Sequence, residues 1–251
     1  MSVWTTWLRC REPRPAAETR VVCLPHAGGA ASFYGSWAAA MSPAFEVVTV
    51  QYPGREDRLV EPFTAGMSTL AEDIGSALVS LDDRPTVLFG HSLGALVAYE
   101  VARILEFRHD IIPARLVVSG RRAPSDPPGG AVHLMPDDAV VEELVGLGGT
   151  DGALLADPDA RSVFLPAIRE DFRLAETYRH LPGVEPTCPI TAVIGTEDTE
   201  VSAAQAARWA DHSTGPFDLH LLPGGHFYLL EEAKAVLDLL ARPIPVKRGS
   251  S

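Results

Sequence analysis

A serine set between two glycines is the residue of this chain best placed for covalent chemistry. The motif GHSLG at residues 90–94 follows an apolar run at 85–90 and opens a largely apolar helical pattern at 93–107. Gly-x-Ser-x-Gly between a strand and a helix is the setting of a nucleophile elbow, in which the serine hydroxyl attacks a carbonyl carbon. The motif alone arises by chance in about one chain in ten of this length, and Ser92 could be a plain helix N-cap. Its position at the end of a strand favours the nucleophile.

A serine hydroxyl attacks efficiently only when a base removes its proton and an acid orients that base. In α/β hydrolases the three residues follow the chain order serine, acid, histidine. Of the eight histidines, His226 stands directly after the last apolar strand pattern, at 217–224, and we expect it to be the base. The acid should follow the strand pattern that ends at Gly195, where Glu197 and Asp198 are both available. Spacing alone does not choose between them.

The oxyanion that forms in such a reaction needs two backbone N–H donors. One should be the N–H of Leu93, the residue after the serine. The other should come from the loop LPHAGGAASFY after the first apolar strand, where we expect Ala27 to donate, with Gly28 as the second choice. The two glycines of this loop could instead cradle a phosphate. Neither G-x-G-x-x-G nor G-x-x-x-x-G-K-[ST] is present, however, which disfavours that interpretation.

Short apolar runs alternate with helical patterns along most of the chain. Strands are expected at residues 19–25, 45–51, 85–90, 114–120, 189–195 and 217–224, and helices at 67–81, 93–107, 202–212 and 227–241. Strands that are apolar on both faces and separated by helices indicate an α/β fold with a mostly parallel sheet covered by helices on both sides. Ligands of such sheets bind at the carboxyl ends of the strands. Ser92 falls at that edge.

One long interval, at about 121–188, interrupts this alternation. It is too long for a bare connection, and its pattern predicts helices at 136–146 and 157–180. Asp157 is the expected N-cap of the second helix, and Pro166 is expected to divide it. We expect a helical lid over the active edge within a single domain at 1–251. The tail at 245–251 is expected to be disordered.

Composition narrows the classes of function. The chain has 251 residues and a formal net charge of −12, which disfavours a nucleic-acid-binding protein. It has no apolar run of the roughly 18 residues that a membrane span requires, and its N-terminal residues lack the apolar core of a signal peptide. The three cysteines lie far apart, and no cysteine–histidine cluster has metal-site spacing. We therefore expect a cytoplasmic monomer without a metal or a bound cofactor.

Six stretches taken together resemble one family, the type II thioesterases. They are LPHAGGAASFY, YPGREDR, FGHSLGALVAYEVA, SGRRAP, GTEDTEV and PGGHFYL, and they follow the family's order from about Val21 to Leu240. The members of this family are stand-alone α/β hydrolases that serve polyketide and nonribosomal peptide synthetases. The resemblance therefore implies an α/β-hydrolase fold for this chain.

The resemblance also assigns roles to residues. It places the nucleophile at Ser92, the acid at Asp198, the base at His226 and the oxyanion loop at His26 and Ala27. It implies hydrolysis of stalled or aberrant acyl thioesters from the phosphopantetheine arm of acyl or peptidyl carrier proteins, which would be the partners. It gives no role to Arg55 in YPGREDR, which we interpret as a structural loop cation.

Three other functions stay open from the sequence. The same catalytic residues would serve a carboxylesterase or lipase-like hydrolase of free small esters, because the two bonds are cleaved by the same machinery. A medium-chain acyl-carrier thioesterase of fatty acid synthesis is a further enzyme of this kind. A silent hydrolase fold that only binds a ligand or a protein is disfavoured by the complete set of serine, acid and histidine.

Overall fold

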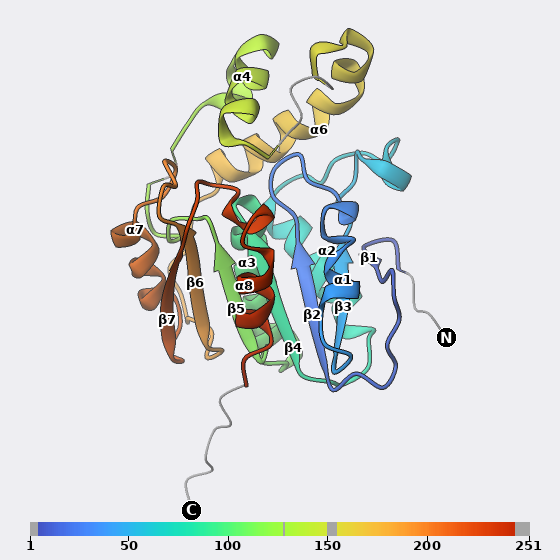
Figure 1. Cartoon of the computed structure of the whole chain (residues 1–251), viewed down its shortest axis with the longest axis vertical. Coiled ribbons are helices and arrows are strands. Elements are labelled where there is room, and N and C mark those ends of the chain that lie inside the picture. The colour runs from blue at the N-terminus through green and yellow to red at the C-terminus, as the bar shows by residue number, and fades with distance from the viewer. Residues whose placement is uncertain (1–4, 128, 150–154, 244–251) are drawn as a thin grey trace, which may run out of the picture.

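A seven-stranded sheet forms the centre of the molecule, with strands in the order β1-β3-β2-β4-β5-β6-β7 (Figure 1). The computed structural model describes residues 5–127, 129–149 and 155–243. The strands are β1 (Leu8–Arg9), β2 (Thr19–Leu24), β3 (Phe45–Val50), β4 (Thr86–His91), β5 (Arg115–Ser119), β6 (Ile190–Gly195) and β7 (Phe217–Leu222). β1 pairs antiparallel with β3, whereas the remaining pairs are parallel. The expectation of a mostly parallel sheet is confirmed.

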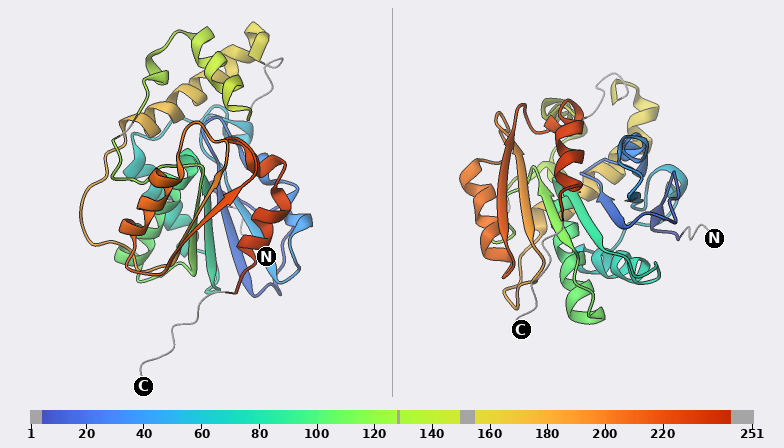
Figure 2. Two further views of the ribbon diagram at one scale, coloured as in Figure 1. Left: turned by 60° about the vertical axis from the view of Figure 1, so that its left-hand side comes forward. Right: turned by 60° about the horizontal axis from the view of Figure 1, so that its bottom comes forward.

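Alternating side chains of the central strands bury two separate apolar layers. Val22 and Leu24 pack with α2 (Met67–Val79) and α3 (Leu93–His109) on one face of the sheet. Val21 and Cys23 point to the other face, where α1 (Trp37–Ala40) and α8 (Ala233–Leu240) cover them. Helices thus lie on both sides of the sheet, as Figures 1 and 2 show. Burial on both faces explains why these strands read as continuous apolar runs in the sequence.

Two of the predicted helices differ from the structure. The helix expected at 202–212 is α7 (Ala203–Ala207) followed by the 3₁₀ helix η4 (Arg208–His212). The one expected at 227–241 begins as the 3₁₀ turn η5 (Tyr228–Leu230), and α8 follows separately. In both places an aromatic side chain is fixed by a hydrogen bond to a distant carbonyl. Trp209 Nε1 donates to the Arg121 carbonyl at 2.8 Å and Tyr228 Oη to the Val193 carbonyl at 3.2 Å. These bonds favour the tighter helical turns over an uninterrupted α-helix.

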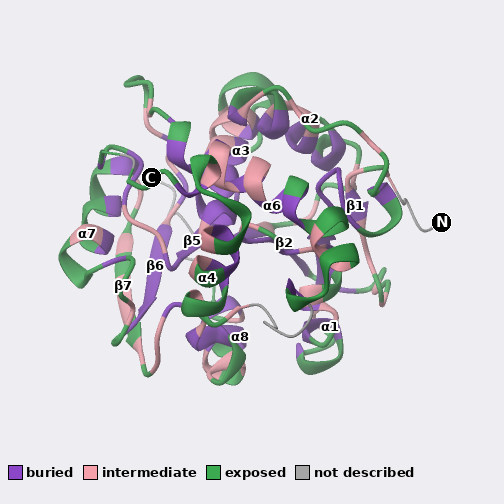
Figure 3. Cartoon of the chain, turned by 90° about the horizontal axis from the view of Figure 1, so that it is seen from above, coloured by how far each residue is buried: buried purple, intermediate pink, exposed green. Residues whose placement is uncertain are grey.

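The interval at 121–188 carries helices that lie across the carboxyl ends of the strands (Figures 1 and 3). They are the 3₁₀ helix η3 (Val132–Leu134), α4 (Asp137–Leu147) and α6 (Pro158–Thr177). As predicted, Asp157 caps α6, and its side chain accepts a hydrogen bond from the Asp159 N–H at 3.0 Å. The expected division at Pro166 is wrong, because α6 runs through it. Leu165 and Ile168, on either side of the proline, are buried in one apolar cluster with α4, which offsets the backbone hydrogen bond that proline cannot make.

Both ends of the chain lie outside the residues that the structure describes, so the prediction of a disordered tail at 245–251 falls on undescribed residues. Within 5–127, 129–149 and 155–243, the helices are too short or too polar to cross a membrane.

Candidate active site

Ser92 occupies the sharp turn between β4 and α3 at the carboxyl edge of the sheet. Its backbone has φ 54° and ψ −115°, a conformation that a residue with a side chain rarely adopts. Its N–H donates to the Ser119 carbonyl of β5 at 2.8 Å, which ties the turn to the neighbouring strand. Such strain persists only where the surroundings enforce it, and it is concentrated at functional sites. The turn has the geometry of the nucleophile elbow that the sequence predicts.

The two glycines of GHSLG are required by close backbone contacts. A Cβ atom on Gly90 would lie 2.0 Å from the carbonyl oxygen of Gly94. A Cβ atom on Gly94 would lie 2.1 Å from the carbonyl oxygen of Leu24, at the end of β2. Both distances are far below van der Waals contact. The elbow therefore packs so tightly against itself and the neighbouring strand that a side chain at either position would displace Ser92.

His226 and Asp198, the predicted base and one of the two predicted acids, are in contact. Nδ1 of His226 lies 3.1 Å from Oδ1 and 3.0 Å from Oδ2 of Asp198. The Asp198 side chain is fully buried, and Oδ1 also accepts a hydrogen bond from the Glu200 N–H at 2.8 Å. Glu197, the alternative that the sequence left open, has an exposed side chain. Of the two acids, Asp198 is the one that contacts the imidazole and can orient it.

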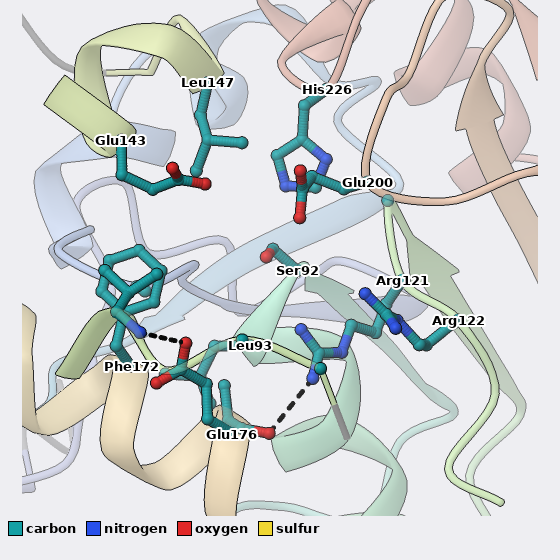
Figure 4. A pocket seen from close by; sticks show the side chains of 16 residues that line it. Ser92, Leu93, Arg121, Arg122, Glu143, Leu147, Phe172, Glu176, Glu200 and His226 are labelled. Atoms are coloured by element: carbon teal, nitrogen blue, oxygen red, sulfur yellow. Dashed lines mark hydrogen bonds between the residues drawn. The ribbon is translucent and has the colours of Figure 1, made fainter. Parts of the chain in front are cut away.

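A cavity of about 120 Å³ brings the candidate residues together. Ser92 and His226 line it from the sheet side, and Figure 4 shows both side chains directed into this space. Ala27 and Leu93, the two expected oxyanion donors, also line it. The opposite wall comes from the segment after β5 and from the insertion. These residues are Gly120, Arg121, Arg122, Gly129, Gly130, Val132, Glu143, Leu147, Phe172, Ala175 and Glu176, with Glu200 from the loop after β6.

The oxyanion loop is bonded to a helix of the insertion. The N–H of Gly28 donates to Oδ2 of Asp171, on α6, at 2.8 Å. Ile168 of the same helix lies so close that a Cβ on Gly28 would be 3.1 Å from its Cγ1. Because the Gly28 N–H already donates to Asp171, Gly28 is the less suitable of the two predicted oxyanion donors. The Ala27 amide is the better candidate in this geometry.

Arg55 is a buried cation that joins three segments. Its guanidinium donates to Asp171 through Nη1 at 2.6 Å and Nη2 at 2.9 Å, and Nη1 also donates to the Gly29 carbonyl at 3.0 Å. Both charged side chains are almost inaccessible to solvent. Burial by itself would lower the pKa of the guanidinium, but the Asp171 carboxylate raises it above its ordinary value. Arg55 thus has a specific structural role, because its guanidinium joins the oxyanion loop to α6.

Two neighbours of Arg55 hold the same loop from its ends. Oη of Tyr52 donates to the Pro25 carbonyl at 3.2 Å, and Oε1 of Gln51 accepts from the Ala31 N–H at 2.9 Å. Nε2 of Gln51 donates in turn to the carbonyl of Arg55 at 3.2 Å. The motif QYPGR therefore acts as one side of a clamp on the oxyanion loop, and Asp171 closes the other side.

Two further histidines lie beside the site but are unsuited to act as its base. Burial, reinforced by the neighbouring His226 and the Arg55 guanidinium, lowers the pKa of His26 to about 3. Burial likewise holds the pKa of His91 well below its ordinary value, and Nδ1 of His91 lies 2.9 Å from Oγ of Ser119. Both rings are therefore neutral at physiological pH. They pack edge-on against the aromatic ring of Phe227 and support the loop that carries His226.

Sequence reasoning missed the contribution of Asp171. It lies in a helix of the insertion, 116 positions after Arg55, and no spacing rule connects the two. One signal was present, because a cation inside a loop that packs against the core requires an anionic partner. The sequence does not say which of the 33 acidic residues supplies it.

Comparison with known proteins places the chain among thioesterases. A thioesterase domain model matches residues 19–243. The curated protein named thioesterase PikA5, from Streptomyces venezuelae, is 42% identical over 245 residues, which cover 97% of this chain and 87% of that protein. The solved structure of the type II thioesterase BorB, from the borrelidin biosynthetic cluster, is 44% identical with a TM-score of 0.87. It covers 94% of this chain and 96% of its own. These findings confirm the resemblance inferred from the sequence and, with it, the α/β-hydrolase fold.

A more distant relative represents fatty acid synthesis. The medium-chain S-acyl fatty acid synthase thioesterase of Rattus norvegicus is 31% identical over 234 residues, which cover 89% of this chain and 86% of that protein. The fatty-acid alternative is therefore supported less strongly than the type II thioesterases.

Proposed function

Because the chain belongs to the thioesterase domain family, we propose that it hydrolyses acyl groups from the phosphopantetheine arm of carrier proteins in polyketide or nonribosomal peptide biosynthesis. In this role it removes stalled or aberrant acyl groups and frees the carrier for another cycle. The observation that carries the proposal is that the strained Ser92 and His226, which is paired with the buried Asp198, line the same cavity. The names of relatives such as the type II thioesterase of the borrelidin biosynthetic cluster support the biosynthetic setting.

The site supports a mechanism with a covalent acyl-enzyme. Oγ of Ser92 attacks the thioester carbonyl while His226 takes its proton, and Asp198 stabilises the imidazolium that forms. The negative charge on the carbonyl oxygen is held by the backbone N–H groups of Leu93 and Ala27, fixed before reaction by the elbow and by the clamp. The protonated His226 delivers its proton to the leaving thiol. It then activates a water molecule that attacks the acyl-enzyme and releases the acid.

The insertion at 121–188 acts, in this proposal, as a lid that forms the acyl pocket. Its inner wall combines apolar side chains, Leu147 and Phe172, with charged ones, Arg122 and Glu143 (Figure 4). A wall that carries charged side chains beside apolar ones suits a short acyl group better than a medium-length fatty chain, which would need a continuous apolar lining. This wall is the observation that separates the proposal from the fatty-acid alternative.

One comparison tests the proposed function. The same short acyl group is presented on a carrier protein, on a small thiol and as a simple oxygen ester, and kcat/KM is measured for each. We expect the highest value for the carrier-bound thioester, and no turnover beyond the residual rate with Ser92→Ala. A higher value for the oxygen ester would assign the protein to the general esterases. Full activity of Ser92→Ala would rule out Ser92 as the nucleophile.

A further inference from the structure

A cluster of two histidines and a glutamate lies at the base of the insertion. His180 and Glu185 belong to the segment that follows α6, and His212 ends η4. One nitrogen from each ring and one carboxylate oxygen lie within 4.8 Å of one another. None of these residues lines the cavity that contains Ser92. We propose that the cluster binds a divalent transition-metal ion of the zinc type, independently of the proposed hydrolysis.

Two of the three distances between ligand atoms of the cluster are close to those of a zinc site, and the third is below 4.8 Å. Oε1 of Glu185 lies 3.4 Å from Nε2 of His180, and Oε2 lies 3.8 Å from Nδ1 of His212. Bonds of about 2.1 Å in a tetrahedral zinc site place neighbouring ligand atoms roughly 3.4 Å apart. Small side-chain movements would therefore complete three-fold coordination. Two imidazoles and one carboxylate favour Zn²⁺ or Co²⁺ over Mg²⁺ and Ca²⁺, which prefer oxygen ligands.

An unpaired buried nitrogen points into the cluster. Among the residues that the structure describes, Nδ1 of His212 has no hydrogen-bond partner, although its side chain is only 3% exposed. The 3.8 Å that separate it from the Glu185 carboxylate are too long for a hydrogen bond. Buried polar atoms are seldom left unpaired, because they lose their hydration without replacement. A cation between this nitrogen and the carboxylate satisfies both groups.

Outer contacts orient two of the ligands. Nε2 of His212 lies 2.9 Å from Oγ of Ser125, and when Nε2 donates its proton there, Nδ1 presents its lone pair to the cluster. Oη of Tyr99, on α3, donates a hydrogen bond to Oε2 of Glu185 and fixes the carboxylate. Histidine and carboxylate ligands of metal sites ordinarily have such supporting partners.

An ion bound by this cluster would connect separate segments of the fold and stabilise it. Ser125 lies near the start of the interval 121–188, and His180 and Glu185 lie near its end. An ion held here links both ends of the insertion to η4 and, through Tyr99, to α3. Because it binds the folded chain, it should raise the melting temperature. The reaction at Ser92 does not require it.

The test is metal binding by the full-length, untagged chain after treatment with a chelator. Zn²⁺ is titrated by calorimetry, and Co²⁺ is titrated by its visible absorption, which reports the coordination geometry. We expect one equivalent per chain, a four-coordinate Co²⁺ spectrum and an increase in melting temperature. Glu185→Gln keeps the shape of the side chain and an acceptor for Tyr99. It should weaken binding at least about tenfold.

A matched variant separates this site from the cavity at Ser92. His226→Ala removes the imidazole of that cavity and should bind Zn²⁺ as the unaltered chain does. The proposal is overturned if the unaltered chain binds no more tightly than Glu185→Gln, or if binding is lost in His226→Ala and kept in Glu185→Gln. His180→Gln removes a second proposed ligand and repeats the test should Glu185→Gln not fold.

Discussion

Replacing Asp171 by asparagine tests whether the insertion positions the oxyanion loop. Asp171→Asn preserves the size of the side chain but removes the negative charge that pairs with Arg55. The new side-chain amide can also direct its nitrogen, which is a donor, toward the Gly28 N–H, which then loses its acceptor. Loss of one partner from a buried ion pair destabilises a protein by about 3–5 kcal/mol, because the other charge stays buried and unpaired. A displaced oxyanion donor costs about 10²–10³ in kcat when it is lost outright. Since Asp171 acts through the loop, we expect kcat to fall about ten- to a hundredfold.

The double variant Arg55→Met/Asp171→Leu separates stability from positioning. It removes both charges and fills the space with apolar side chains. Its free energy of unfolding should therefore be close to that of the unaltered chain and higher than that of Asp171→Asn. The Gly28 N–H still lacks its acceptor, and kcat should stay low while KM changes little. Free energies of unfolding come from urea titrations, and kcat and KM from hydrolysis of an acyl thioester on a carrier protein.

An ion pair elsewhere in the insertion supplies the control. Asp137 pairs with Arg169 at 2.5 Å, and both side chains are at least partly exposed. Asp137→Asn should therefore change the free energy of unfolding by less than about 1 kcal/mol and leave kcat unaltered. Recovery of the full kcat in the double variant, together with its stability, would refute the reasoning. The loop would then hold its shape without Asp171.

Three more predictions follow from the same structure. Gly90→Ala should prevent folding, because its Cβ would lie 2.0 Å from a carbonyl oxygen. On α4, a Cβ at Gly146 would have no described atom within 4 Å, so Gly146→Ala should raise the free energy of unfolding by about 0.5–1 kcal/mol. Thermal melts measure both, and a soluble, active Gly90→Ala would contradict the description of the elbow. Leu147→Ala enlarges the cavity and should shift the ratio of kcat/KM values toward longer acyl groups; an unchanged ratio would show that this wall does not select chain length. Finally, the lowered pKa of His26, about 3 against 6.5 in the unfolded chain, means that the unfolded chain alone binds this proton between those values. The free energy of unfolding should fall as pH drops through this window, by up to about 1.4 kcal/mol per pH unit for this group, and His26→Asn should flatten the slope measured between pH 6.5 and 4. Equal slopes would contradict the assignment.

The sequence predicted the parts of the fold whose residues carry their own pattern. The strands β2, β4, β5 and β6 are buried along nearly their whole length and end beside a glycine or proline, so each could be located from a short window. The two-residue β1 and the four-residue α1 have too few residues for a periodic pattern, and they form because β3 and the core are already in place. Helix type in 202–212 likewise depended on where Trp209 had to point, which only the tertiary structure determines.

For the candidate site too, some residues could be placed from the sequence and others could not. Ser92 and His226 could be placed because parallel strands bring their carboxyl ends to one edge of the sheet. The choice between Glu197 and Asp198 could not be made from spacing, since it depends on which side chain the turn directs inward. Residues that meet only through the insertion, such as Arg55 and Asp171, cannot be paired from a local pattern, although a buried cation implies that an anionic partner exists.

The clamp also constrains how a lid over this site could open. Asp171 and Ile168 lie on the part of α6 that contacts the oxyanion loop, so this part of the helix cannot swing away without moving Gly28. The end of α4 has a different neighbour, because a Cβ on Gly149 would lie 2.1 Å from the ring of Phe227, next to His226. Movement of α4 alone would therefore break the contact with Phe227 and leave the contacts of Gly28 with Asp171 and Ile168 in place. A carrier-bound acyl group that entered beside α4 would then find the backbone N–H groups of the oxyanion loop already in position. Electrostatic stabilisation of a transition state requires donors that are fixed in this way before the reaction.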